Sequence, residues 1–347
     1  MNTPLYWIYV TKKGTKCYLY FDETLSGAIL ADNELHTELP DFSKTAQADC
    51  TGIENCEETN GLYQATDDDG TTYYFRGAVD NNWVQFAGFY WRIIRINGDG
   101  SIRLIYSGDS ESGPVETGEG TQIGTSAFNE QAHDNAYVGY MYGASGSDTY
   151  EETHTNINDS TIKTVIDTWY QTNLISYSNY ISTEAGFCGD RQLSTEEESN
   201  NGLGGFGTTI TYYGANYRLY RNKTPSFECT NTADFYTVAN ASSGNKALDY
   251  PIGLLTIDEA SYAGGVNMHD VNNQSYYLYT RKYYWTMSPS SYGGSSRVFY
   301  VNENGLLSWS RSTLETAGSV RSVINLRSDV EVLRGSGTQT DPYVITE

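Results

Sequence analysis

The chain of 347 residues is poor in basic residues and has no long apolar run. It holds 21 Lys and Arg against 43 Asp and Glu, which gives a formal net charge of -22 at pH 7. This balance argues against a nucleic-acid partner, because phosphates require a basic face. No stretch approaches the roughly 20 apolar residues of a membrane-spanning helix, and "LYWIYV" near the start is too short for a signal sequence. We expect that any export signal or anchor has been cut away or was never present, so a removed N-terminal anchor is the one membrane link left open.

The sequence also lacks the signatures of common catalytic and metal sites. There is no HExxH, CxxC or G-x-S-x-G, so we expect neither an enzyme nor a cofactor. "TDDDGTT" (66–72) is similar to a calcium loop, but an EF-hand counted from Asp67 places Ala78 where a bidentate Glu belongs. A polar turn is the favoured interpretation, and a structural calcium stays open. The four histidines are scattered: His36, His133, His154 and His269.

Tyrosine and glycine are abundant instead. The chain has 31 Tyr and 34 Gly, and aromatic residues reach 14%. Disordered chains are poor in aromatic residues, and helical bundles are rich in Leu, Ala, Glu and Lys. The composition therefore predicts a loop-rich, mixed α+β fold with much β-structure.

The five cysteines favour an oxidising compartment. Cys50 and Cys56 close a short loop that contains Gly, and Cys188 and Cys229 bracket a loop-rich region. We expect both pairs to form disulfides in an exported protein, with Cys17 left over. The alternative is a set of reduced thiols in a cytosolic protein.

Strand and helix signals give the expected order of elements. Residues 1–60 form a lead-in, and 61–347 form the main domain, with strands at both of its ends. "NGDG" (97–100) predicts a hairpin between apolar runs, and Asn304–Gly305 predicts another. In "YWRIIRI", Arg92 and Arg95 are expected to be ion-paired or at a solvent edge rather than ligand-binding.

Two helices are predicted. Over 160–174, apolar residues recur at helical spacing. Over 257–263, Thr256 and Glu259 form a capping box, and Gly264–Gly265 ends the helix. The Gly-, Ser- and Asn-rich stretch 176–250 between them is interpreted as an insertion held by Cys188 and Cys229.

Three stretches together resemble the C-type lectin fold, in the branch that holds formylglycine-generating-enzyme-like proteins and the variable proteins of diversity-generating retroelements. "LLTIDEASYAGG" resembles the R-L-P-T-x-x-E helix start of that branch, with Leu255 in place of Pro. "YWTMSPS" resembles its W-[ST]-x-S strand. "RVFYVNENG…SVRSVINL" resembles its aromatic hairpin and G-x-R-x-V strand, from which Ser319 and Ser322 depart.

The resemblance implies a C-type-lectin-like fold with two helices, a twisted antiparallel sheet and long irregular loops. "GSGTQTDPYVI" also resembles a closing ribbon in surface proteins of gut Gram-positive bacteria. Formylglycine-generating activity is rejected, because it needs a late cysteine pair and no cysteine follows Cys229. Calcium-dependent sugar binding lacks its E-P-N or Q-P-D loop and its W-N-D strand.

In the variable proteins, the late hairpin and its flanking loops carry the diversified ligand-binding face. The matching stretch here, 283–312, has one acid, two arginines and no lysine, and is filled with Tyr, Ser, Gly, Asn and Trp. Tyr and Trp offer stiff contact area, and Ser, Gly and Asn offer adaptable hydrogen bonds. We expect one exposed face at 290–296 and 307–316, with these ligand-binding residues: Ser290, Ser291, Tyr292, Ser295, Ser296, Tyr300, Asn302, Trp309, Ser310 and Arg311.

Other residues of this region are expected in the core, namely Trp285, Phe299, Val301 and Val323. Two functions remain open. The first is a protein displayed at the cell surface or secreted, which binds an unknown protein or glycan. The second is a structural subunit of an envelope, pilus-like or phage-tail assembly, with tyrosines buried between subunits.

Overall fold

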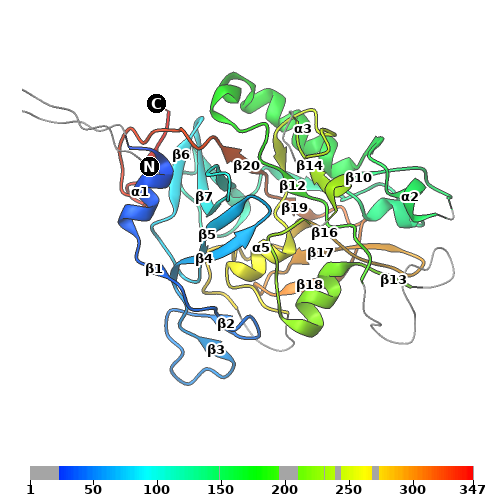
Figure 1. Cartoon of the computed structure of the whole chain (residues 1–347), viewed down its shortest axis with the longest axis horizontal. Coiled ribbons are helices and arrows are strands. Elements are labelled where there is room, and N and C mark those ends of the chain that lie inside the picture. The colour runs from blue at the N-terminus through cyan, green and yellow to red at the C-terminus, as the bar shows by residue number, and fades with distance from the viewer. Residues whose placement is uncertain are drawn as a thin grey trace, which may run out of the picture.

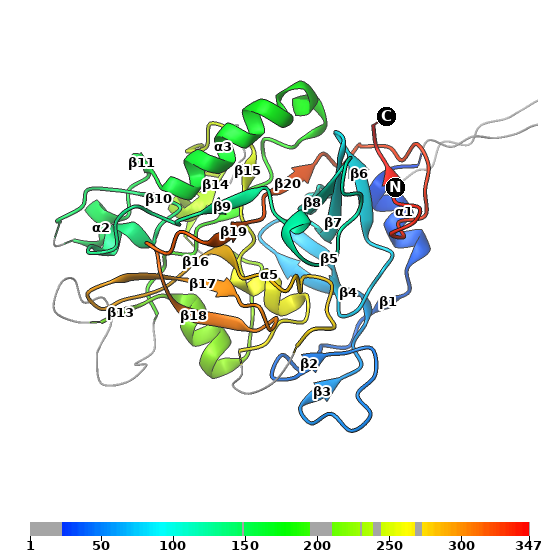
Figure 2. The ribbon, with the colours of Figure 1, turned by 180° about the vertical axis from the view of Figure 1, so that it is seen from behind.

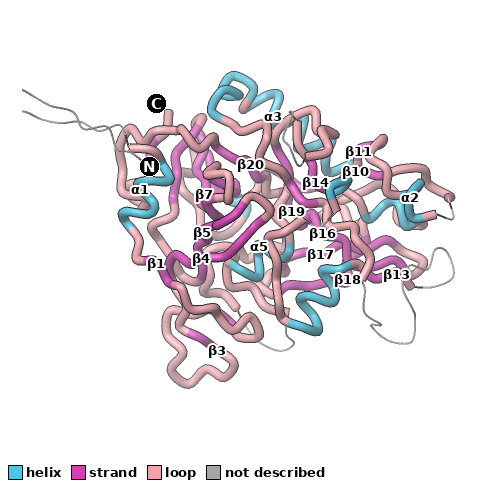
Figure 3. Tube along the Cα trace, viewed as in Figure 1, coloured by secondary structure: helices cyan, strands magenta, loops and turns pink. Residues whose placement is uncertain are grey.

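The computed structural model describes residues 23–147, 149–194, 210–229, 231–238, 244–267 and 273–346. Two antiparallel-rich sheets lie side by side, and loops join most of the elements (Figures 1 and 3). The mixed α/β class, rich in sheet and with few helices, is confirmed. Cys17 and His269 lie outside the described residues.

The first sheet brings together strands from both ends of the chain. It runs β1-β4-β5-β7-β8-β20-β15, with β6 on β7 and β21 on β6. Its strands are β1 (Leu35–His36), β4 (Gly61–Asp67), β5 (Gly70–Arg76), β6 (Trp83–Phe86), β7 (Phe89–Ile96), β8 (Ile102–Asp109), β15 (Ile252–Gly253), β20 (Val323–Leu326) and β21 (Tyr343–Val344). Because β20 pairs with β8 and β21 with β6, the expected adjacency of early and late strands is confirmed.

The second sheet is built mainly from the late part of the chain. It runs β18-β17-β16-β19-β9, with β13 on β16. Its strands are β9 (Gly124–Ser126), β13 (Thr211–Tyr212), β16 (Tyr284–Tyr292), β17 (Ser296–Val301), β18 (Leu307–Ser312) and β19 (Gly318–Val320). Three two-stranded ribbons complete the described strands: β2 (Thr45–Ala46) with β3 (Cys56–Glu57), β10 (Met141–Tyr142) with β11 (Asn158–Asp159), and β12 (Phe187–Cys188) with β14 (Phe235–Tyr236).

Both predicted helices form where their caps place them, and both bridge the two sheets. Helix α3 (Thr161–Asn173) begins after Ser160, whose side chain accepts from the Lys163 amide, and α5 (Ile257–Tyr262) begins at the complete Thr256–Glu259 capping box. Helix α5 contacts β5 as well as β16, β17 and β18, and α3 contacts β15 and β9. The helices therefore fasten one sheet to the other.

Short helical segments that the sequence did not predict also form. These are α1 (Leu25–Asp32), α2 (Tyr150–Thr153), α4 (Gly214–Asn216) with a π-helical continuation Tyr217–Asn222, and the 3-10 turns Glu119–Thr121, Asn135–Val138, Ile175–Tyr180 and Thr232–Asp234. Helix α1 buries Leu25, Ala28 and Ile29 in the main core. The described part of the lead-in is thus packed on the domain. No described helix has the length and apolarity needed to cross a membrane.

The two predicted hairpins and the two predicted disulfides are confirmed. Strands β7 and β8 turn at 97–100, and β17 and β18 turn at 302–306, with Gly100 and Gly305 at φ of 84° and 79°. This left-handed backbone favours Gly. The disulfides are Cys50–Cys56 and Cys188–Cys229.

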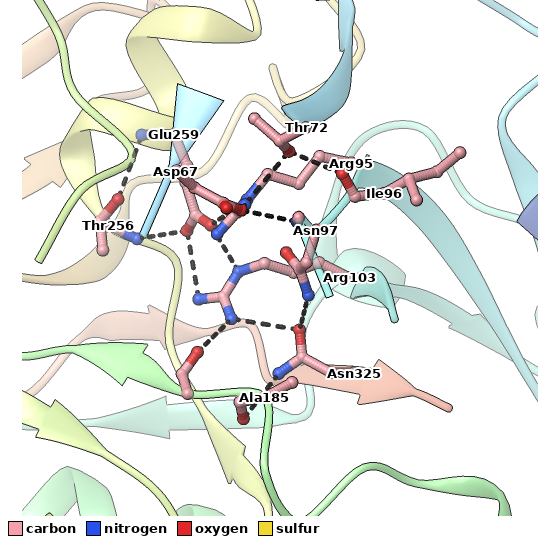
Figure 4. Close-up of polar contacts among 12 residues, drawn as sticks. Asp67, Thr72, Arg95, Ile96, Asn97, Arg103, Ala185, Thr256, Glu259 and Asn325 are labelled. Carbon is pink, nitrogen blue, oxygen red and sulfur yellow. Dashed lines mark hydrogen bonds and ion pairs between the residues drawn. The ribbon is translucent and has the colours of Figure 1, made fainter. Parts of the chain in front are cut away.

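A buried polar network joins α5 to the first sheet (Figure 4). The Glu259 carboxylate of α5 lies 2.5 Å from Nε of Arg103 on β8 and 3.4 Å from Nε of Arg95 on β7. Arg95 also pairs with Asp67 on β4, which belongs to the predicted polar turn 66–72. Burial lowers the pKa of Arg103, whereas the Glu259 charge opposes that shift. The ion-paired expectation is confirmed for Arg95.

The same expectation is wrong for Arg92. Its side chain is buried, and among the described residues no carboxylate lies within 4.0 Å of its guanidinium. The guanidinium instead lies over the Trp83 ring, at 4.3 Å from the centroid. Aromatic faces attract a cation through their quadrupole, so Arg92 holds its charge without an acid among the described residues.

Candidate functional site

The predicted binding segment forms β16, β17 and β18 of the second sheet, which are labelled in the view from behind in Figure 2. Asn302 shapes the β17–β18 turn, because its side-chain oxygen accepts from the amides of Asn304 and Leu306, both at 2.9 Å. The core expectation is confirmed for Trp285, Phe299, Val301 and Val323, which are fully buried. The strands of the predicted face therefore exist, and the question becomes which side chains they expose.

Exposure was predicted wrongly for four of the candidate residues. Ser290, Ser291, Tyr292 and Ser296 are buried. The segment 129–138 covers the end of this hairpin: the Ser296 amide donates to Ala132 O at 2.7 Å, and the Tyr292 hydroxyl donates to His133 O at 3.2 Å. Strand β13 also pairs with β16 at Ser291 and Tyr292. Segments remote in sequence thus remove these residues from solvent.

The partly exposed candidates are Ser295, Tyr300, Asn302, Trp309 and Arg311, whereas the side chain of Ser310 lies outside the described part. Arg311 is the centre of this group. Its guanidinium lies 3.9 Å from the ring centroid of Tyr283 and 4.6 Å from that of Tyr300. We call these three residues the Arg311 stack. Glu315 lies 3.7 Å from Arg311 at a partly exposed position.

A β-bulge separates Trp309 from the Arg311 stack. Tyr300 pairs with Ser308, and Val298 pairs with Arg311. Strand β18 therefore has one residue more than β17 between these two pairs. An extra residue reverses the alternation of side chains across the sheet. Trp309 therefore lies 6.4 Å from the Tyr220 ring, whereas Arg311 shares a face with Tyr300. Trp309 and Tyr300 both pack against the main core.

Two contributors were missed by the sequence analysis. Tyr283 precedes β16 and lies within the Tyr-rich stretch, so its composition could have included it. Tyr220 comes from the π-helical segment of the insertion, and no local pattern links it to β18. Burial raises the pKa of Tyr283, and the nearby Arg311 charge opposes the shift.

The insertion is anchored beside this site by Tyr213. Its amide donates to Ser290 O at 3.1 Å, and its hydroxyl contacts Asn135 and lies 2.9 Å from His154 Nε2. Burial lowers the pKa of His154 to about 3, with a further contribution from the Arg191 charge. Neutral His154 is therefore part of the support for β13 and β16.

Acid should loosen this support. The unfolded chain takes up a proton on His154 below its ordinary pKa of about 6.5, whereas the folded chain does not until about pH 3. Stability from this residue is thus lost as pH falls from about 6.5 to about 3. Urea unfolding at pH 7 and pH 5 should show a loss of about 1–2 kcal/mol that His154→Gln abolishes. An equal pH dependence in the variant would contradict this role.

Truncation should cost more stability at Tyr292 than at Tyr300. Tyr292→Ala removes a buried ring and should cost about 3 kcal/mol of stability. Tyr300→Ala removes a partly exposed ring and should cost less than about 1 kcal/mol. Thermal melts of the two variants check this order, and equal losses would place both rings in one environment.

A cluster of three carboxylates, Asp159, Asp167 and Asp249, lies elsewhere on the described surface. The Lys163 ammonium already pairs with Asp159 at 3.1 Å and with Asp167 at 2.6 Å. A cation at this place would have to displace that ammonium, so we assign no metal to it.

Comparison with known proteins found no relative of this chain. No family model matches it, and neither the curated proteins nor the solved structures contain a significant match.

Proposed function

We propose that this chain is an extracellular ligand-binding protein of the C-type-lectin-like, diversifiable type, whose binding face is centred on the Arg311 stack. The observation that carries the proposal is the partly exposed stack itself, in which the Arg311 guanidinium contacts both the Tyr283 and the Tyr300 ring. Its ligand is a protein or a glycan, and no catalytic step is involved.

The chemistry of the stack suits recognition. Arg and Tyr are enriched among the few residues that supply most of the energy of an interface. A stacked guanidinium is already ordered before a partner arrives, so binding loses little side-chain entropy. Around the stack, Asn302 and Ser308 add amide and hydroxyl groups at partly exposed positions. The face therefore combines stiff aromatic contacts with adaptable polar ones.

The arrangement of the fold supports the same proposal. Strands from both ends of the domain share one sheet, α3 and α5 follow in the expected order, and a late hairpin presents the face. A C-type-lectin-like domain is expected to have this order. Two disulfides, Cys50–Cys56 and Cys188–Cys229, fit an oxidising compartment outside the cytosol.

A displayed library tests the proposal without knowledge of the natural ligand. Positions 295, 300, 308 and 311 are randomised together on yeast, and clones are selected for binding to purified lysozyme. We expect most clones to keep the protease resistance of the parent, because exposed positions tolerate change. Binders with Kd below about 1 μM should emerge, as rigid paratopes of this composition allow.

A matched library randomises the buried positions Thr286, Ser288 and Ser290 of β16. It should lose protease resistance in most clones. If the face library unfolds as often as this control, the positions are structural and the proposal fails. If the parent protein instead sediments as a large assembly that Arg311→Ala disrupts, the face joins subunits and the assembly function replaces the binding function.

The gene neighbourhood gives a separate test of diversification. A reverse transcriptase gene and a near-copy repeat of the segment that encodes 283–312 are expected close to this gene. Without them, the retroelement part of the proposal is withdrawn, whereas the binding face is still judged by the library.

A further inference from the structure

A pocket that includes no residue of the Arg311 stack lies against β7. It has a volume of about 180 Å³ and is formed between the loop 78–80, β7, residues 116–117 and the loop 274–279. Three tyrosines of the last loop line it, namely Tyr276, Tyr277 and Tyr279, and Arg92 of β7 lines it as well. Pockets for drug-sized ligands are roughly 300–1,000 Å³, so this one suits a small molecule or a single chemical group.

Arg92 brings a buried charge to this pocket. Its exposed fraction is 1%. The Nε donates to Asn82 Oδ1 and Nη2 donates to the Val79 carbonyl, both at 2.6 Å. Among the described residues no acceptor is bonded to Nη1, and no carboxylate lies within 4.0 Å of the guanidinium. Since a guanidinium has five N–H donors, this side chain keeps unused donors.

Tyr277 adds a second unused polar group. Its ring lies 5.2 Å from the Arg92 guanidinium carbon, and its side chain is 7% exposed. Its hydroxyl is buried and has no hydrogen-bond partner among the described residues. Tyr276, in contrast, donates its hydroxyl to Gly305 O at 3.0 Å. Buried hydroxyls are normally bonded in folded proteins, so the Tyr277 oxygen requires an explanation.

An anionic ligand would supply what both groups lack. A carboxylate has two oxygens that match the planar fork of a guanidinium and can also accept from a phenol. The acids around the pocket, Asp80 and Glu116, are exposed at its rim. They would repel a doubly charged phosphate or sulfate more strongly than a single carboxylate. The aromatic lining suits a ligand with an apolar or ring-shaped body.

We propose that this pocket is a binding site for a small monocarboxylate, held by Arg92 and the Tyr277 hydroxyl. The site does not depend on the Arg311 stack, and its test is independent of that face. Burial lowers the pKa of Arg92 to about 9, so the guanidinium stays charged at neutral pH.

Titration calorimetry at pH 7 with sodium benzoate and with neutral benzamide tests the site. The two probes share a ring and differ in charge. We expect benzoate to bind with a Kd in the millimolar range or tighter, and benzamide to bind at least about ten-fold more weakly, because it loses a charge-assisted bond. The proposal would be overturned if benzoate gave no heat of binding at any concentration up to about 50-fold below its solubility limit. Equal affinity for benzoate and benzamide would also overturn it.

Two variants separate binding from folding. Tyr277→Phe removes only an oxygen that has no described partner, so it should leave the melting temperature unchanged and weaken benzoate about ten-fold. Tyr140→Phe is the matched control. Tyr140 also has a buried hydroxyl with no hydrogen-bond partner among the described residues, and it does not line this pocket. The control should change neither quantity. If Tyr277→Phe leaves the benzoate affinity unchanged, the hydroxyl is not a ligand and the proposal is rejected.

Discussion

Glu259→Ala should remove about 3–5 kcal/mol from the free energy of unfolding, because it leaves two buried guanidinium groups without their shared acid. The Glu259 side chain is 3% exposed and contacts both Arg103 and Arg95. The same carboxylate accepts from the Thr256 amide at 2.9 Å, so the variant also opens the capping box of α5. Urea unfolding followed by tryptophan fluorescence measures the loss.

The matched control is Asp329→Ala. Asp329 pairs with Arg327 at 2.5 Å, but their side chains are 64% and 50% exposed. Ion pairs this exposed to solvent contribute little to stability, so this variant should be close to the parent. Glu259→Gln should fall between the two, because it keeps an acceptor for the Thr256 amide and loses the charge. Similar losses for Glu259→Ala and Asp329→Ala would show that the network does not fasten α5 to the sheet.

Removing the Cys188–Cys229 disulfide should cost about 4 kcal/mol. The two cysteines are 41 residues apart, and the loss of chain entropy in the unfolded state grows with the length of the closed loop. The bond also fixes the insertion beside the Asp68 carboxylate, which accepts from the Cys229 amide at 2.8 Å. The double variant Cys188→Ser/Cys229→Ser is compared with the parent by urea unfolding.

The Cys50–Cys56 pair serves as the control of equal chemistry. It closes only 6 residues, so the variant Cys50→Ser/Cys56→Ser should lose about 2 kcal/mol. The order of the two losses is the decisive result. A greater loss from the short loop would mean that native contacts, rather than unfolded-chain entropy, set the contribution of these bonds.

Local chemistry explains which elements could be predicted. Ser160 and the Thr256–Glu259 box define helix starts through bonds within a few residues, so α3 and α5 lie close to their predicted bounds. Gly100 and Gly305 supply left-handed turns that hairpins require. The spacing of Cys50 from Cys56 likewise restricts that pair to one loop. In each case, the atoms that decide the structure are neighbours in the chain.

The late segment shows where local information ended. Its strand pattern was correct, but burial of Tyr292 depends on residue 133, and burial of Ser291 depends on β13 from the insertion. The bulge that separates Trp309 from Arg311 depends on how two strands match in length across the sheet. These contacts join residues that are far apart in the chain, so the amino-acid composition does not predict them.

The sequence by itself determined the sheet-rich class, the two capped helices, the hairpin turns and the Cys50–Cys56 disulfide, because short-range bonds and spacing specify them. The Cys188–Cys229 disulfide was predicted from the loop-rich region that the two cysteines bracket. Only the tertiary structure decided which tyrosines are exposed and which charges have no oppositely charged partner among the described residues. Arg92 is an example: a strand arginine is expected to meet an acid or water, yet packing placed its guanidinium over the Trp83 ring and near the Tyr277 ring. Exposure and charge pairing are set by segments that meet only after folding, and these contacts are what create both proposed sites.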